Sequence, residues 1–235
     1  MAPTHPDSIP MRQPMDDGLD SLKFTRYGIT LFYIVINANT DPLFIYTATA
    51  TSWLFGSRVI ALRLPSAFFS ILSFATTYVA LAELTRGEFD SKMRKQIAII
   101  AVVALAASQP IAFFNRMGLR FSTQDVIQMA AVWALARAIR LTDMAGFKKP
   151  VRAWLVAGAL VSLTQYTYPA ARVLPLLFGL IFLIKAPSGW WRNKNFWRGV
   201  TLFALAAFVV ILPQLIWYAF YPDTFLARAG QTSLR

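Results

Sequence analysis

The 235-residue sequence contains no cysteine and a single histidine, His5. The absence of cysteine excludes disulfide bonds and thiolate metal sites, and one histidine excludes both a histidine zinc cluster and a histidine-based catalytic triad. Charge is scarce as well, because Asp, Glu, Lys and Arg make up 14% of the residues and only 11 of these are acidic. Any catalysis must therefore use carboxylate, arginine or tyrosine side chains, or a lipid partner.

Hydrophobic residues take the place of the missing charge. They make up 57% of the chain, and the mean hydropathy is +0.50, which is outside the range of soluble domains. The net charge of +12 would suggest nucleic-acid binding in a soluble protein, but the basic residues here lie in short clusters between apolar segments. We therefore predict an all-α integral membrane protein that contacts membrane lipid and no nucleic acid.

Six apolar windows are long enough to suggest transmembrane helices, since a span needs roughly 20 residues. They cover residues 65–84, 96–114, 122–141, 151–168, 171–183 with an extension to 185, and 200–220. The third window has Gln124, Asp125 and Gln128 near its start. We expect Asp125 to be a helix N-cap or to pair with Arg116 or Arg120, rather than to be a catalyst.

The basic residues between these windows predict the topology, because Lys and Arg are retained on the cytoplasmic side. Every second connector is basic, and these connectors contain Arg86, Lys92, Arg94 and Lys95, then Arg137, Arg140, Lys148, Lys149 and Arg152, then Lys185, Arg192, Lys194 and Arg198. We predict that residues 1–64 form an outer segment, residues 65–220 a transmembrane domain and residues 221–235 an outer tail. The protein would then lie in the cytoplasmic membrane with both termini outside.

Within the outer segment, residues 43–55 have the pattern of an interfacial helix. Leu43, Tyr46, Ala50, Trp53 and Leu54 recur at helical spacing, while the threonine and serine residues fall mainly between them. This distribution is typical of an amphipathic helix that lies in the membrane surface.

Three outer carboxylates are candidates for chemistry: Asp16, Asp17 and Asp41. An Asp pair in a proline-rich segment can be a solvated turn or a helix N-cap. Alternatively, carboxylates at a membrane surface can act as a general base, or bind a divalent cation that neutralises a phosphate leaving group.

Outer arginines form a second candidate group, because they run against the positive-inside trend. Arg116 and Arg172 lie in the two outer turns, and Arg172 follows Tyr166 and Tyr168 in the segment TQYTYPAARVLP. They either anchor the helices at the interface or bind a lipid phosphate through bidentate contacts, with the tyrosine hydroxyls as further donors.

Several short motifs, in order, resemble the GT-C glycosyltransferases of the protein O-mannosyltransferase and aminoarabinose-transferase type. The motifs are MDDGLDSLKFTRYGITLFY, NTDPLFIYTATATSWLFGSRVIALRLPSAFFSILS, FFNRMGLRFSTQD and TQYTYPAARVLP. The resemblance covers residues 12–220, without the family's first span and its C-terminal part. It implies transfer of a sugar from a polyprenyl-phosphate donor to an acceptor outside the membrane.

The resemblance also implies roles for individual residues. Asp16 falls at the family's catalytic aspartate, and Asp17 replaces the usual glutamate beside it. Asp41 falls near an acidic residue that helps to coordinate a divalent metal in some members. Arg116 and Arg172 become candidates for binding the donor phosphate, with Tyr168 beside Arg172. The alternative is a non-catalytic subunit that retains a partial GT-C fold and packs against partner membrane chains.

Overall fold

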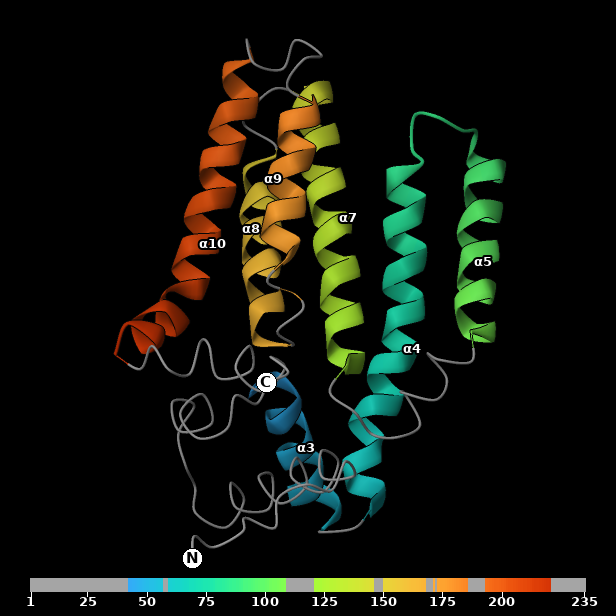
Figure 1. The fold of residues 1–235 in the computed structure, drawn as a ribbon. Coiled ribbons are helices and arrows are strands. Elements are labelled where there is room, and N and C mark those ends of the chain that lie inside the picture. Colours follow the sequence, from blue (N-terminus) through green and yellow to red (C-terminus); the bar gives the residue numbers. More distant parts are fainter. Residues whose placement is uncertain are drawn as a thin grey trace, which may run out of the picture.

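The computed structural model describes residues 42–56, 59–108, 121–145, 150–167, 171, 173–185 and 193–220. This part of the chain is helical and contains no strand (Figure 1). The elements are α3 (Pro42–Phe55), α4 (Val59–Leu84), α5 (Ser91–Ala107), α7 (Phe121–Ala145), α8 (Val151–Leu163), the 3₁₀ turn η1 (Thr164–Tyr166), α9 (Leu174–Lys185) and α10 (Lys194–Phe220). The all-α prediction is confirmed, and each apolar window corresponds to one helix.

The helices stand side by side and alternate in direction (Figure 1). α4 packs on α5 and on α7, α7 packs on α8, and α8 packs on α10. One end of this bundle carries the α4–α5 turn and the starts of α8 and α10, which are the helix ends that hold the three basic clusters, so we call it the basic end. α3 packs on α4 at the opposite end, which we call the α3 end.

Local sequence explains where the helices stop. α3 is followed by Gly56 with φ 75°, and the α4–α5 turn contains Gly87 with φ 103°. Both are left-handed conformations that favour glycine. α5 then begins after Asp90, whose side chain accepts a hydrogen bond from the Met93 N–H at 3.2 Å. This N-cap satisfies one of the unpaired donors in the first turn of α5.

The core lies between α7, α8 and α10. Trp154 of α8 is completely buried there, and its indole Nε1 donates to the Thr142 hydroxyl of α7 at 2.9 Å. Glycines let α10 approach closely: a Cβ atom on Gly158 would lie 2.1 Å from the Phe203 carbonyl oxygen, and one on Gly199 would lie 2.3 Å from the Trp154 ring. Close backbone approach through small residues is typical of helices that pack within membranes.

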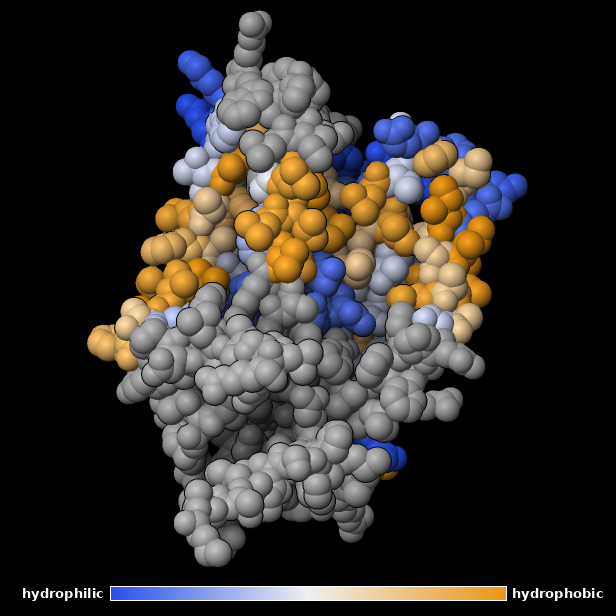
Figure 2. Space-filling view, in the orientation of Figure 1, coloured by the Kyte–Doolittle hydropathy of each residue, from blue (hydrophilic) through white to orange (hydrophobic). Residues whose placement is uncertain are grey.

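On the face shown in Figure 2, the described residues are largely apolar over the middle of the helices and hydrophilic at the upper ends of α4 and α5. Two helices are long and apolar enough to cross a membrane, namely Arg63–Leu84 within α4 and Lys194–Phe220, which is α10. α5, α8 and α9 have 17, 13 and 12 residues, fewer than the roughly 20 that a span needs. The six-span count therefore stays a prediction.

Candidate functional site

The six predicted site residues lie outside the described part of the chain: Asp16, Asp17, Asp41, Arg116, Tyr168 and Arg172. Four of them are next to described helix ends. Asp41 immediately precedes α3, Arg116 belongs to the connector between α5 and α7, and Tyr168 and Arg172 fall between η1 and α9. These helix ends all lie at the α3 end of the bundle (Figure 1). The fold thus places the flanks of these segments, which are far apart in the sequence, at the same end of the bundle.

α3 buries polar and apolar residues on the same side. Thr49 and Ser52 are buried together with Phe44 and Ala48, whereas Trp53 is 75% exposed. Buried hydroxyl groups beside an exposed tryptophan are unusual for a helix of a water-soluble protein. The interfacial amphipathic helix stays a prediction, and the exposed Trp53 is available for contact with lipid.

Hydroxyl groups attach α3 to its neighbour. The Thr51 hydroxyl donates to the Ala61 carbonyl of α4 at 2.6 Å, and the Thr47 hydroxyl donates within α3 to the Phe44 carbonyl at 2.8 Å.

Burial raises the pKa of the Tyr46 phenol above its ordinary value, because the charged form loses solvation. Tyr46 therefore remains a neutral hydroxyl at physiological pH.

The turn before Arg172 is held by side-chain hydrogen bonds. Gln165 Nε2 donates to the Ala171 carbonyl at 2.9 Å, and the buried Thr167 hydroxyl donates to the Thr164 carbonyl at 2.6 Å. The Ala171 carbonyl belongs to the peptide bond that leads to Arg172. Gln165 therefore fixes the backbone on which this predicted phosphate ligand is carried.

A polar layer joins this turn to α10. The Ser162 hydroxyl donates to the Ala207 carbonyl at 2.6 Å, the Tyr166 hydroxyl to the Val210 carbonyl at 2.8 Å, and Gln214 Nε2 to the Tyr218 hydroxyl at 2.9 Å. Pro213 lies inside α10 beside these contacts, where it removes one backbone donor. The layer aligns α8 and η1 with α10 near the α3 end.

The predicted N-cap role of Asp125 is wrong. α7 begins at Phe121, four residues earlier, so Asp125 lies within the helix, and its side chain is exposed. Ser122 and Thr123, which begin the predicted window 122–141, are buried within the first turn of α7. The alternative partners of Asp125, Arg116 and Arg120, lie outside the described residues.

No group of three His, Cys, Asp or Glu side chains that could hold a metal ion occurs among the residues that the structure describes. The described helices thus supply no carboxylate cluster to complete a site at Asp41.

Residues 39–217 match the model of the dolichyl-phosphate-mannose-protein mannosyltransferase family. The chain belongs to this family. Neither the curated proteins nor the solved structures give a match. Membership in the mannosyltransferase family indicates a GT-C type glycosyltransferase with a polyprenyl-phosphate sugar donor, and it agrees with the apolar helices α4 and α10. The matched range contains Asp41, Arg116, Tyr168 and Arg172, whereas Asp16 and Asp17 precede it.

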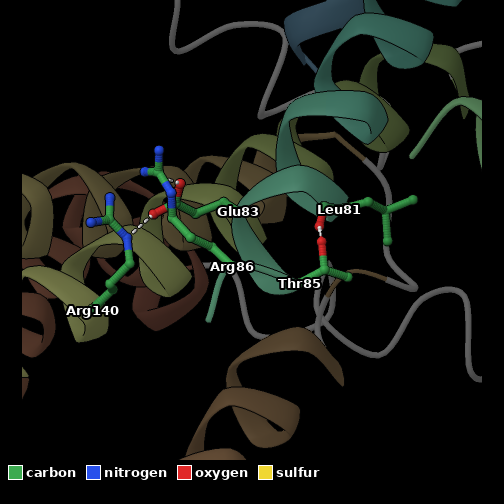
Figure 3. A network of polar contacts seen from close by, with 5 residues as sticks. All are labelled: Leu81, Glu83, Thr85, Arg86 and Arg140. Atoms are coloured by element: carbon green, nitrogen blue, oxygen red, sulfur yellow. Dashed lines mark hydrogen bonds and ion pairs between the residues drawn. The ribbon is translucent and has the colours of Figure 1, made fainter. Parts of the chain in front are cut away.

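One charged network of this mannosyltransferase-family protein was not predicted from the sequence. Glu83 of α4 is only 8% exposed, and its Oε1 lies 2.6 Å from Arg140 Nε of α7, while its Oε2 lies 3.3 Å from Arg86 Nη1 (Figure 3). From the sequence, Arg86 and Arg140 were interpreted only as part of the basic connectors that predict the topology. The signal that could have identified the network is a lone glutamate just before the end of an apolar window.

Proposed function

We propose that this protein is an integral membrane glycosyltransferase that moves a sugar from a polyprenyl-phosphate donor to an acceptor at the outer membrane surface. The observation that supports the proposal is that the helix ends flanking Asp41, Arg116, Tyr168 and Arg172 all lie at one end of the bundle. A catalytic site assembled from several connectors at one end of a helical scaffold needs this arrangement.

The proposed reaction is a single displacement with inversion at the anomeric carbon. Asp16, with Asp17 beside it, takes the proton from the acceptor hydroxyl, and the acceptor oxygen attacks the anomeric carbon of the donor sugar. The bond between that carbon and the phosphate oxygen breaks, and its electron pair leaves with the polyprenyl phosphate. Arg116 and Arg172, with the Tyr168 hydroxyl, stabilise the negative charge of this leaving group.

The described structure contributes to this reaction by positioning. Gln165 bonds the Ala171 carbonyl, and Tyr166 of η1 bonds the Val210 carbonyl of α10, so the described residues on both sides of Tyr168 are held by hydrogen bonds. Thr51 attaches α3, which directly follows Asp41, to α4. Pre-organised groups lower the barrier more than mobile ones, because they need no reorganisation as charge develops. A divalent metal at Asp41 remains a separate prediction, and the proposed steps do not require it.

A transfer assay tests the proposal. The purified full chain in lipid nanodiscs is offered labelled polyprenyl-phosphate sugars with a panel of acceptor peptides and glycolipids, and wild type is compared with Asp16→Asn and Asp41→Asn. We expect Asp16→Asn to lose at least about 100-fold in rate, which is the usual contribution of a general base. The matched control is Asp90→Asn at the basic end, where asparagine retains the N-cap and turnover should be unchanged.

Two outcomes would contradict the proposal in different ways. Full turnover by Asp16→Asn would reject this residue as the base. A folded wild-type chain that transfers no sugar from any donor, but co-purifies with partner membrane chains in fixed stoichiometry, would identify a non-catalytic subunit.

A further inference from the structure

The corner formed by α4, α5 and α7 at the basic end carries an excess of positive charge. Its charged residues are six basic ones and four acidic ones, namely Arg86, Lys92, Arg94, Lys95, Arg137 and Arg140 against Glu83, Glu88, Asp90 and Asp143. Hydrophilic residues cover the upper ends of α4 and α5, directly above the apolar band of the surface (Figure 2). The positive charge therefore lies where an apolar belt meets water, which is the level of lipid headgroups.

Glu83 holds two of these basic side chains in fixed positions. Its nearly buried carboxylate binds Arg140 through one oxygen and Arg86 through the other (Figure 3). Because one carboxylate balances only one of the two guanidinium groups, the trio keeps one positive charge. Arg140 ties Glu83 to α7, so the carboxylate holds Arg86 at a defined position beside the α4–α5 turn.

Arg86 has donors to offer beyond this contact. Its side chain is 43% exposed, and Glu83 engages it through Nη1, whereas a guanidinium group has five N–H donors. Arg94, in the first turns of α5 on the other side of the same turn, has a buried Nε atom without a hydrogen-bond partner in the described structure. Both groups are suited to a phosphate, which accepts several charge-assisted hydrogen bonds at once.

We propose that this corner is a binding site for the headgroup of an anionic phospholipid, with Arg86 and Arg94 as phosphate ligands and Glu83 as the residue that positions Arg86. Basic pockets between transmembrane helices are suited to such headgroups. The surrounding apolar band accommodates the acyl chains, which favours a lipid over a free anion. The site lies at the end opposite to the proposed catalytic residues, and its test does not depend on glycosyl transfer.

The experiment is a lipid titration of the purified full chain, followed by native mass spectrometry, with phosphatidylglycerol and phosphatidylcholine as the two probes. Wild type should prefer phosphatidylglycerol, and Arg86→Gln should weaken that binding about fivefold, the loss expected for one arginine at an anionic lipid surface. The matched control is Arg152→Gln, which removes the same charge from the start of α8 at the same end of the bundle. It should leave the preference unchanged.

Glu83→Gln separates a built site from general attraction. This variant raises the net charge by one, so non-specific attraction predicts tighter binding of phosphatidylglycerol. The proposed site predicts weaker binding, because Arg86 loses the carboxylate that holds it. Thermal unfolding of each variant ensures that only folded protein is compared, and Arg94→Gln supplies a second loss-of-donor variant if Glu83→Gln does not fold.

Three results would overturn the proposal. They are equal affinity of wild type for the two lipids, unchanged or tighter binding of phosphatidylglycerol by a folded Glu83→Gln variant, and displacement of the lipid by millimolar inorganic phosphate. The last result would identify a site for a free anion instead.

Discussion

Two hydroxyl groups on the buried side of α3 differ from their neighbours in their hydrogen bonding. Thr47 and Thr51 donate to backbone carbonyls, but Thr49 Oγ1 and Ser52 Oγ are buried without a hydrogen-bond partner within the described structure. Burial of an unpaired hydroxyl costs about 1–3 kcal/mol. α3 carries this cost directly after Asp41 in the sequence, at the α3 end of the bundle.

Replacement of Thr49 by valine should therefore stabilise the protein. Valine keeps the shape and helix propensity of threonine and removes the unpaired group, so we expect Thr49→Val to raise the free energy of unfolding by about 1 kcal/mol. Thr51→Val is the matched control, and it should be destabilising because it removes the donor to the Ala61 carbonyl. Thermal unfolding in detergent measures both. Destabilisation by Thr49→Val would mean that its hydroxyl has a partner in the native protein.

At the scale of helices, the contact between α8 and α10 depends on glycine. A Cβ atom at Gly158 would clash with the Phe203 carbonyl oxygen of α10, and backbone atoms cannot move aside as a side chain can. Gly158→Ala should therefore lower the free energy of unfolding by about 1–3 kcal/mol. Chemical unfolding of the detergent-solubilised chain, monitored by tryptophan fluorescence, gives the value.

Gly179 of α9 provides the control for this substitution. A Cβ atom there would have no neighbour within 4 Å, and alanine is favoured over glycine within a helix by about 0.5–1 kcal/mol. Gly179→Ala should thus be neutral or stabilising. If the two variants had equal stability, the close packing of α8 against α10 would be wrong.

The sequence predicted the existence of these helices better than their ends. Each apolar window contains a helix, but α4 begins at Val59 and not at residue 65, and α10 begins at Lys194 and not at residue 200. An apolar window reports the length of chain that prefers lipid, whereas a helix continues for as long as its backbone hydrogen bonds are satisfied. Charged residues such as Arg63 in α4 and Arg198 in α10 therefore end the apolar window without ending the helix.

Contacts between distant residues were not predictable in the same way. Glu83 and Arg140 are 57 positions apart, and nothing in the local sequence pairs one with the other. The same holds for the hydrogen bond from Tyr166 to the Val210 carbonyl. The sequence predicted which connectors carry the candidate site, because counting the basic residues predicts the side of the membrane on which each connector lies. The hydrogen bonds that support the site depend on helix packing, which only the structure gives.

At the scale of the whole molecule, the distribution of charge predicts which end of the bundle faces the cytoplasm. The helix ends at the basic end carry the three clusters of Lys and Arg, and the α3 end carries the flanks of the proposed catalytic segments. If the positive-inside rule applies, every connector at one end is cytoplasmic and every connector at the other is outside. α5 is the most informative helix for a test of this topology. Its 17 residues are fewer than a span usually needs, so whether it crosses the membrane has to be measured.

The absence of cysteine makes this topology directly measurable. Ser91 and Ser108 lie at the two ends of α5, so Ser91→Cys and Ser108→Cys place one thiol at each end of the same helix. In intact cells, a membrane-impermeant maleimide should label position 108 and not position 91, and inverted vesicles should give the reverse. Labelling of both positions from one side would show that α5 does not cross the membrane, which would reject the six-span count. Labelling with the sides exchanged would place the proposed catalytic residues in the cytoplasm and contradict transfer at the outer surface.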